Sequence, residues 1–322
     1  MPENKLPLIS VCVPTYNKVN YVERLLDSID AQSYKNIEVL IADNSEGEAI
    51  AVLAEKYKDL LPGLIYKKND PPVGMAENHN EVTKMAKGDW VKIMHSDDWF
   101  AHPASLQIFA DAALLQNEAF FIFSGCTEIA LDNFKQTPHI PTNEQIIPLQ
   151  DDPLFLFNHN IIGHPSTMMH KNTKDIFYDP DFKWVVDIDF YMRFLMKYKK
   201  IHFIGQSLIN IGIDNSQESA SCYKNPAVEI PEYFNLLNKY SPEKIDNISV
   251  FHAFWKLMKK FAVRSHDQIR AAGYNGNIPP AILDIVNIQK NIPRILMKQT
   301  AISDYLMKKC FSRFIQKALN RK

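Results

Sequence analysis

The sequence predicts an α/β protein with a mostly parallel sheet flanked by helices, followed by a helical C-terminal region. Over the first 125 residues, short runs of β-branched and apolar residues alternate with stretches of helical apolar spacing. From about residue 228 onward the spacing is helical throughout. Alternation of strands and helices is typical of a parallel sheet covered by helices, which gives the predicted fold class.

Each expected strand is an apolar run that ends at a polar residue or a proline. The expected strands are 9–13, 37–42, 64–66, 90–94, 119–123, 166–170 and two short runs within 201–213. The expected helices are 20–32, 48–60, 78–86, 106–115, 187–198, 229–238, 247–272, 279–290 and 300–320. Residues 126–165 are rich in loops and prolines.

The charge of the chain is unevenly distributed. Its 322 residues suggest two domains at ~150 residues each. The net charge is −1, but residues 1–225 carry −10 and residues 226–322 carry +9. We therefore expect a domain over 1–225 and a helical region over 226–322, unless the split reflects only two solvated surfaces.

Several classes of protein are excluded or disfavoured. We expect no secretory leader; no run of about 18 apolar residues is present, and the four cysteines form no CxxC pair. A cytoplasmic protein with reduced thiols is expected. The acidic front and the short basic tail argue against a nucleic-acid partner. No glycine-rich phosphate loop is present.

Polar residues gather where three of the predicted strands end. Thr15 and Tyr16 follow the first strand, Asp43 follows the second, and the pair Asp97 and Asp98 follows the fourth. In parallel sheets the ligand lies outside the carboxyl ends of the strands. These residues are therefore the candidates for a binding site.

For each acidic candidate the residues alone leave two interpretations open. Asp97 and Asp98 can hold Mg²⁺ or Mn²⁺, or they can cap a helix or form a turn. Asp43 can accept hydrogen bonds from a nucleobase or ribose, or form an Asx-turn. Asp187, in the first turn of a predicted helix, can point at a ligand or complement the helix dipole.

The C-terminal end is basic and amphipathic. From Tyr305 to Lys322 there are six basic residues and no acidic one, and helical spacing places Met307, Phe311, Phe314 and Ile315 on one side. Such a helix can lie on an anionic membrane, or it can pack on its own domain or on a second subunit.

Five segments in order resemble the family 2 glycosyltransferases, which have the GT-A fold. They are VPTYN at 13–17, IADNS at 41–45, GMAENHNEVTKMAKGDWVKIMHSDDW at 74–99, WVVDIDFYMRF at 184–194 and SLINIGIDNSQES at 207–219. The resemblance covers about residues 7–220. It implies a bacterial surface-polysaccharide enzyme that inverts the anomeric carbon of a sugar taken from a nucleotide-diphosphate sugar, a UDP-sugar above all.

The resemblance also assigns roles to individual residues. It implies that Asp187 is the catalytic base and that Asp98 and Asp97 hold Mn²⁺ or Mg²⁺. The nucleotide pocket would be lined by Pro14, Thr15, Tyr16, Asp43, Asn78 and Asp97. The implied acceptor is a glycan or a lipid-linked molecule, with peripheral membrane contact through residues 300–322, and the chain could associate with itself.

Four positions depart from the family pattern. His95 occupies the first acidic position of a strict DXD motif, Val186 replaces the usual Glu before the base, and Gly212 and Asp214 replace an Arg and a His. A nucleotidyltransferase, or a non-catalytic sugar-nucleotide-binding protein of the same fold, are the alternative functions. The first would need a basic, glycine-rich loop after strand one, which VPTYNKVNY lacks.

Overall fold

The computed structural model describes residues 6–116, 118–214 and 221–319. These residues form two compact units. The first comprises the described residues within Met1–Pro153, Ile161–Phe182 and Asp189–Gln217, and the second comprises those within Leu154–Asn160, Lys183–Ile188 and Glu218–Lys322. The expected boundary at residue 225 stays a prediction about independent domains, because a compact unit need not fold alone.

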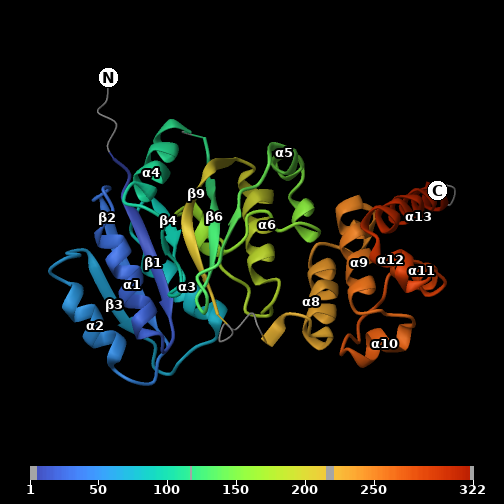
Figure 1. Cartoon of the computed structure of the whole chain (residues 1–322), viewed down its shortest axis with the longest axis horizontal. Helices are drawn as coiled ribbons and strands as arrows, with labels where there is room; N and C mark the ends of the chain where they lie inside the picture. Colours follow the sequence, from blue (N-terminus) through green and yellow to red (C-terminus); the bar gives the residue numbers. More distant parts are fainter. Residues whose placement is uncertain (1–5, 117, 215–220, 320–322) are drawn as a thin grey trace. The chain divides into compact units, whose positions relative to one another are not determined.

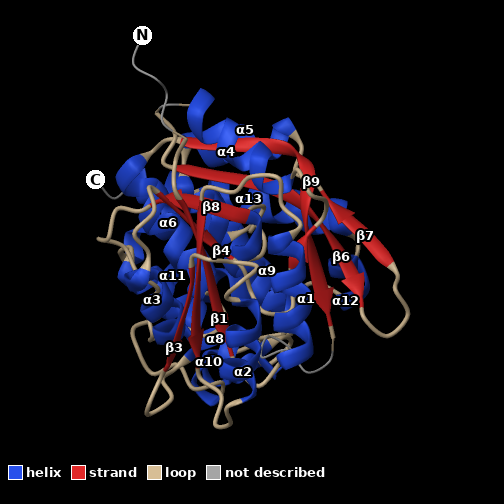
Figure 2. Cartoon of the chain, turned by 90° about the vertical axis from the view of Figure 1, so that its left-hand side faces the viewer, coloured by secondary structure: helices blue, strands red, loops and turns tan. Residues whose placement is uncertain are grey.

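The first unit is built on a nine-stranded sheet among the described residues (Figures 1 and 2). The strand order is β3-β2-β1-β4-β8-β6-β9-β5, with β7 paired to β6. The strands are β1 Ile9–Thr15, β2 Ile37–Asp43, β3 Leu64–Lys68, β4 Trp90–Ile93, β5 Trp99–Phe100, β6 Phe121–Ala130, β7 Gln136–His139, β8 Met168–Lys171 and β9 Ile201–Ile213. The segment β3-β2-β1-β4 is parallel throughout, and β6 also runs parallel to β9.

Helices flank this sheet, as the sequence predicts. They are α1 Val19–Asp30, α2 Ala49–Tyr57, α3 Met75–Met85, α4 Ser105–Leu115, α5 Asn143–Asp151 and α6 Val186–Tyr198. The apolar face predicted for α1 is fully buried, with Val22, Leu25, Leu26 and Ile29 all at 0% exposure. The α/β fold class with a helical C-terminal region is confirmed.

The second unit is helical. It contains α8 Pro226–Lys239, α9 Ile248–Lys260, α10 His266–Ala271, α11 Pro280–Lys290, α12 Arg294–Lys298 and α13 Thr300–Leu319, drawn in orange to red in Figure 1. Trp255 of α9 is buried and donates its indole N–H to Ser303 Oγ of α13 at 3.0 Å. Gln289 of α11 donates to the Trp255 carbonyl at 2.9 Å, so α9 is the centre of this unit.

Three local expectations were wrong. The two short runs within 201–213 are one strand, β9, which is interrupted only by a register shift opposite Gly125. The loop-rich stretch 126–165 contains the end of β6, β7 and α5. The helix expected over 247–272 is two helices, because Ala262 adopts a φ of 51° and Ser265 caps α10.

All four cysteines are buried. Cys12 and Cys126 belong to the first unit, and Cys222 and Cys310 belong to the second. Burial raises the pKa of the Cys126 thiol to about 12 and also raises the pKa of Cys12. Neither environment is that of a reactive thiol or a zinc ligand, which agrees with the absence of a CxxC pair.

Candidate active site

Two strand ends lie side by side at the carboxyl edge of the sheet. Thr15, the last residue of β1, is in register with Asp43, the last residue of β2. Asn78 of α3 donates its side-chain amide to the Thr15 carbonyl oxygen at 3.3 Å. Pro14 is buried in β1, and Tyr16 is 57% exposed beyond it. The structure therefore brings together five of the residues predicted to line the nucleotide pocket.

The Thr15 hydroxyl has no protein partner among the described residues. The residue is 2% exposed, and Oγ1 makes no hydrogen bond within the part of the chain that the structure describes. A buried polar group left in this state costs about 1–3 kcal/mol. A ligand group at this edge of the sheet would supply the missing partner.

Three asparagines connect the ends of the first three strands, and we call them the amide network: Asn44, Asn69 and Asn78. Asn69 follows β3 and donates both side-chain protons, one to Asn44 Oδ1 and one to Asn78 Oδ1, each at 2.8 Å. Asn44 in turn donates to the Val73 carbonyl at 2.8 Å. The sequence prediction missed Asn69, although the rule that polar residues at strand ends form the site applies to it equally.

The carboxylate of Asp43 is fully buried and well supplied with donors. Oδ1 accepts the Ser45 backbone N–H at 2.8 Å and the Ser45 hydroxyl at 2.5 Å. Oδ2 accepts the Tyr66 hydroxyl at 2.8 Å, and Lys68 Nζ lies 3.9 Å away. Burial, and then this bond to Asp43, raise the pKa of Tyr66. The Asx-turn left open by the sequence is therefore formed, and contact of Asp43 with a nucleobase stays a prediction.

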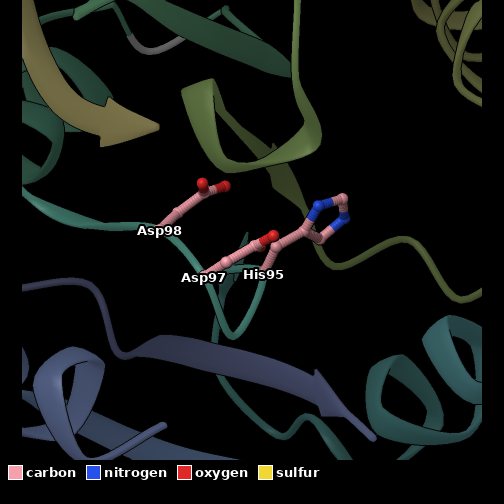
Figure 3. Close-up of side chains that lie close together, drawn as sticks. All are labelled: His95, Asp97 and Asp98. Atoms are coloured by element: carbon pink, nitrogen blue, oxygen red, sulfur yellow. The ribbon is translucent and has the colours of Figure 1, made fainter. Parts of the chain in front are cut away.

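The turn between β4 and β5, residues 95–98, is called here the acidic loop. One ring nitrogen of His95 and one carboxylate oxygen from each of Asp97 and Asp98 lie within 4.8 Å of one another (Figure 3). These are donor types that bind divalent cations. The sequence predicts the two aspartates as metal ligands, with His95 flanking the pair at the first acidic position of a strict DXD motif.

Asp98 is the most perturbed member of this loop. It is 1% exposed, Oδ1 accepts the Gly212 N–H at 3.3 Å, and the buried Oδ2 makes no hydrogen bond to any described residue. Burial, and then the charge of Asp97, raise the pKa of Asp98 to about 7. A cation would give Oδ2 its missing partner and stabilise the carboxylate form, so the donor set fits a divalent ion.

A buried lysine fixes the backbone around the acidic loop. Lys92 of β4 is 0% exposed and donates to the carbonyl oxygens of Ile93, at 3.2 Å, and of Ser166. The Ser166 hydroxyl accepts the backbone N–H of His95 at 2.8 Å. Burial lowers the pKa of Lys92 to about 7. This lysine thus ties the turn at Ser166 to the start of the acidic loop.

Strand β9 passes close to the other end of the loop. Arg24 donates to the Asp97 carbonyl at 2.6 Å, and a Cβ added to Gly212 would overlap that same oxygen. Asp214 accepts the Tyr21 hydroxyl at 2.7 Å. Gly212 on β9 and Asp214 just after it, two of the departures from the family pattern, therefore have local structural roles. Residues 215–219 of that segment lie outside the described residues.

Asp187 is the second residue of α6 and belongs to the segment counted with the second unit. Its side chain is half-buried. Just before it, Glu232 of α8 accepts the backbone N–H groups of residues 183–185 at 3.0, 2.7 and 3.0 Å. Asp189 has a different role, because it is fully buried and paired with Arg193 Nε at 2.8 Å. The fold thus fixes the entry to α6 through a carboxylate that sequence reasoning missed.

Residues 10–177 match the model of the family described as "Glycosyl transferase family 2". The abequosyltransferase RfbV of Salmonella typhimurium is 31% identical over 162 residues, which are 48% of this chain and 45% of that protein. An uncharacterised protein of Mycobacterium tuberculosis is 26% identical over 59% of this chain and 63% of its own length. The chain thus spans roughly half to two thirds of these relatives.

Two solved structures share the fold. TarS residues 1–349 from S. aureus, in complex with UDP-GlcNAc, superposes with a TM-score of 0.57 at 18% identity, covering 88% of each chain. The mannosyltransferase PcManGT of Pyrobaculum calidifontis, in complex with GDP-Man and Mn²⁺, gives a TM-score of 0.54 at 15% identity, covering 99% of this chain and 89% of its own. Together with the family match over more than half of the sequence, these findings show that the chain is a GT-A glycosyltransferase belonging to glycosyltransferase family 2.

Proposed function

We propose that the chain transfers a sugar from a nucleotide-diphosphate sugar, with UDP as the nucleotide, to a hydroxyl of a glycan or lipid-linked acceptor, with inversion. The observation that carries this proposal is the arrangement at the carboxyl edge of the sheet. Three features meet there, at the ends of neighbouring parallel strands: the amide network, the acidic loop and the buried Thr15 hydroxyl. That hydroxyl has no partner among the described residues. Solved neighbours bind UDP-GlcNAc, UDP or GDP-Man, which supports a nucleotide-sugar donor.

In this proposal the nucleotide occupies the edge formed by β1 and β2. Pro14, Thr15 and Tyr16 line it, with the exposed Tyr16 ring available to stack on the base. Asp43 contacts the base, and Asn78 lies near the ribose or the phosphates. The bonds from Ser45 and Tyr66 hold Asp43 in place for that contact.

The reaction needs a base for the acceptor hydroxyl, and we assign that role to Asp187. It takes the hydroxyl proton as the acceptor oxygen bonds to the anomeric carbon, while the bond from that carbon to the diphosphate oxygen breaks and UDP leaves. The three N–H groups bound by Glu232 fix the backbone just ahead of Asp187. A base held this way keeps its orientation from one turnover to the next.

Asp98 and Asp97 are the residues that would hold Mn²⁺ or Mg²⁺. Once bound, such a cation supplies charge neutralisation for the leaving diphosphate. The buried Oδ2 of Asp98, which lacks a partner among the described residues, supports this assignment. The PcManGT complex with Mn²⁺ supports a divalent cation in a protein of this fold.

Replacing Asp187 by Asn tests the assigned reaction, because Asn keeps the shape but cannot accept the proton. Sugar transfer from a panel of UDP-sugars and GDP-sugars, measured by nucleotide release with Mn²⁺ present, should fall by about 10²–10⁴-fold. Asp181→Asn, at an exposed position nearby, is the matched control and should be neutral. Full activity of the Asp187 variant would remove the residue from the mechanism.

We also propose a glycan or lipid-linked acceptor at a membrane surface, in keeping with the polysaccharide enzymes among its relatives. The structure changes which face of the tail could make that contact. Met307 is 1% exposed. The ring centroids of Phe311 and Phe314 lie 5.2 and 5.9 Å from the ring centroid of Phe251 in α9. The apolar face of α13 is therefore packed on its own unit, which was the alternative left open by the sequence.

The opposite face of α13 is the one available for contact. Lys308, Lys309 and Arg313 are exposed, and so are Tyr305 and, on α12, Ile295. Basic residues beside exposed apolar ones are attracted to anionic lipid. Across the described ranges, no helix has the length and apolar content needed to cross a bilayer. Self-association of the chain stays a prediction.

Flotation with vesicles tests the membrane contact without removing a helix that α9 needs. The double variant Lys308→Glu/Lys309→Glu should lose binding to phosphatidylserine vesicles while neither protein binds neutral vesicles. Reversing Lys244 and Lys239 to Glu gives a charge-matched control elsewhere in the second unit. Equal flotation of both variants would reject this surface.

A further inference from the structure

His95 is linked to a second histidine of the first unit. His79 Nδ1 lies 2.9 Å from the Met75 carbonyl oxygen, and His79 Nε2 lies 2.9 Å from His95 Nε2. The two rings meet edge to face, with centroids 5.0 Å apart. A carbonyl oxygen can only accept a hydrogen bond, so the proton of His79 sits on Nδ1.

This geometry determines the tautomer of His95. His79 is 7% exposed, and with its proton on Nδ1, facing the Met75 carbonyl, the neutral ring carries its lone pair on Nε2. The short contact between the two Nε2 atoms then requires the proton of His95 to be on Nε2. Nδ1 of His95 is left as the nitrogen with a lone pair to offer, in a ring that belongs to the acidic loop.

We propose that His95 Nδ1 is a third ligand of the divalent cation, beside Asp97 and Asp98, and that His79 is the positioning residue that keeps this nitrogen free of hydrogen. The inference deepens the cation site of the proposed function and rests on it. Two observations carry it: a His95 ring nitrogen lies within 4.8 Å of both carboxylates, and Asp98 Oδ2 is buried without a partner among the described residues. An imidazole whose other nitrogen donates to a fixed acceptor is the usual arrangement of a metal-binding histidine.

The donor set makes a prediction about which ion is preferred. Mg²⁺ favours sites made of oxygen ligands and water, whereas imidazole nitrogen suits transition metals. A site with one nitrogen and two carboxylates should bind Mn²⁺ more tightly than Mg²⁺. His95→Asp, which restores an all-oxygen set, should reduce the preference for Mn²⁺ over Mg²⁺ by about tenfold or more.

The test uses the full-length, metal-free protein and Mn²⁺ alone, with no donor or acceptor. Loss of the free Mn²⁺ electron paramagnetic resonance signal gives the affinity. Pulsed spin-echo spectra of protein with ¹⁵N-labelled histidine report whether a histidine nitrogen is bound to the ion. Wild-type protein should show the nitrogen coupling, and His95→Ala should lose it and bind Mn²⁺ about 10–100-fold more weakly.

His79→Phe should weaken binding by about tenfold, because it leaves the His95 tautomer unfixed. His266→Ala, an exposed histidine of the second unit, is the matched control and should change nothing. The coupling in wild-type protein needs no variant, so a variant that misfolds does not spoil the test.

Each other result has a distinct meaning. If wild-type protein binds Mn²⁺ without nitrogen coupling, the inference is overturned and a carboxylate site remains. The same follows if His95→Ala binds Mn²⁺ as tightly as wild type. Transfer activity in a protein that binds no Mn²⁺ overturns the inference and the cation, but not the glycosyltransferase reaction. A nitrogen-coupled ion in a protein that transfers no sugar from any donor supports the inference and counts against the proposed function.

Discussion

The amide network and the acidic loop lie at the same edge of the sheet but are stabilised in opposite ways. In the amide network, both amide protons of Asn69 have acceptors, and Asn44 both donates and accepts. In the acidic loop, Asp98 is buried with one oxygen that no described residue contacts through a hydrogen bond, and burial raises its pKa. In the first region the folded chain satisfies these hydrogen-bonding groups. In the second, one buried carboxylate oxygen has no hydrogen-bond partner among the described residues and is available to a ligand. Under the proposed function, the neutral amide network would lie beside the nucleotide and the charged acidic loop would hold the cation.

Among the variants that test this comparison, Asp98→Asn should have the largest effect on sugar transfer. We expect sugar transfer to fall by roughly 10²-fold or more, because an amide is a much weaker cation ligand than a carboxylate. The free energy of unfolding of the metal-free protein at pH 8 should rise instead, because the buried charge is gone. Urea titration and transfer assays on the same preparation measure both changes.

The pH dependence of metal-free stability checks the same argument. The folded-state pKa of Asp98, about 7, lies above its ordinary value of 3.8. Between these two values the unfolded chain loses the proton that the folded protein keeps, so stability should fall as the pH rises from about 4 to about 7. The slope should be at most about 1.4 kcal/mol for each step of one in pH. Asp98→Asn should lack this component, and a variant less stable than wild type at pH 8 would show that the charge is not strained.

The next effect should come from Gly212→Ala. Its Cβ would overlap the Asp97 carbonyl oxygen, so the acidic loop must move, at a cost of about 1–3 kcal/mol and with weaker Mn²⁺ binding. Gly205→Ala on the same strand is the control, because the nearest atom to its Cβ would be 4.0 Å away. Matching losses in the two variants would mean that β9 does not constrain the loop.

Asn69→Ala should act on stability alone. It leaves the acceptor oxygens of Asn44 and Asn78 without this donor, which should lower the unfolding free energy by about 1–2 kcal/mol. Mn²⁺ affinity should not change, if the two regions are independent as the comparison implies. Asn20→Ala, at an exposed position of α1, controls for the loss of an amide. A loss of Mn²⁺ affinity in Asn69→Ala as well would show that the two regions are energetically coupled.

The smallest effect should come from Tyr66→Phe. It removes one hydrogen bond to Asp43 and should cost about 0.5–1.5 kcal/mol in urea unfolding. Tyr305→Phe, at a 64% exposed tyrosine, should cost less than about 0.5 kcal/mol. Equal values for the two would indicate that the Tyr66 hydroxyl does not stabilise Asp43.

The strands that form the site could be predicted because they are short apolar runs with polar ends. The end of β2 at Asp43 and the position of the acidic loop after β4 were both predictable from the chain itself. Helix α3 was expected from residue 78 but begins at Met75, since Gly74 provides an extended N-cap that apolar spacing does not reveal. The sequence was sufficient to predict an element where the local pattern of apolar and polar residues determines it.

What could not be predicted depends on contacts between distant parts of the chain. The link between His79 and His95, the approach of Gly212 to Asp97, and the capture of residues 183–185 by Glu232 all join different elements. No periodicity or motif encodes such pairs, because their side chains meet only after the sheet has formed. The surface against which the apolar face of α13 packs was left open for the same reason.

The reactivity of the four buried cysteines can report which part of the chain unfolds first. Each compact unit contains two thiols, and in the first unit burial keeps both of them protonated. A thiol reagent can therefore modify a given cysteine only after its surroundings open. Mass spectrometry of labelling against urea concentration would show whether Cys12 and Cys126 become reactive before, with or after Cys222 and Cys310, and so whether the two units melt separately.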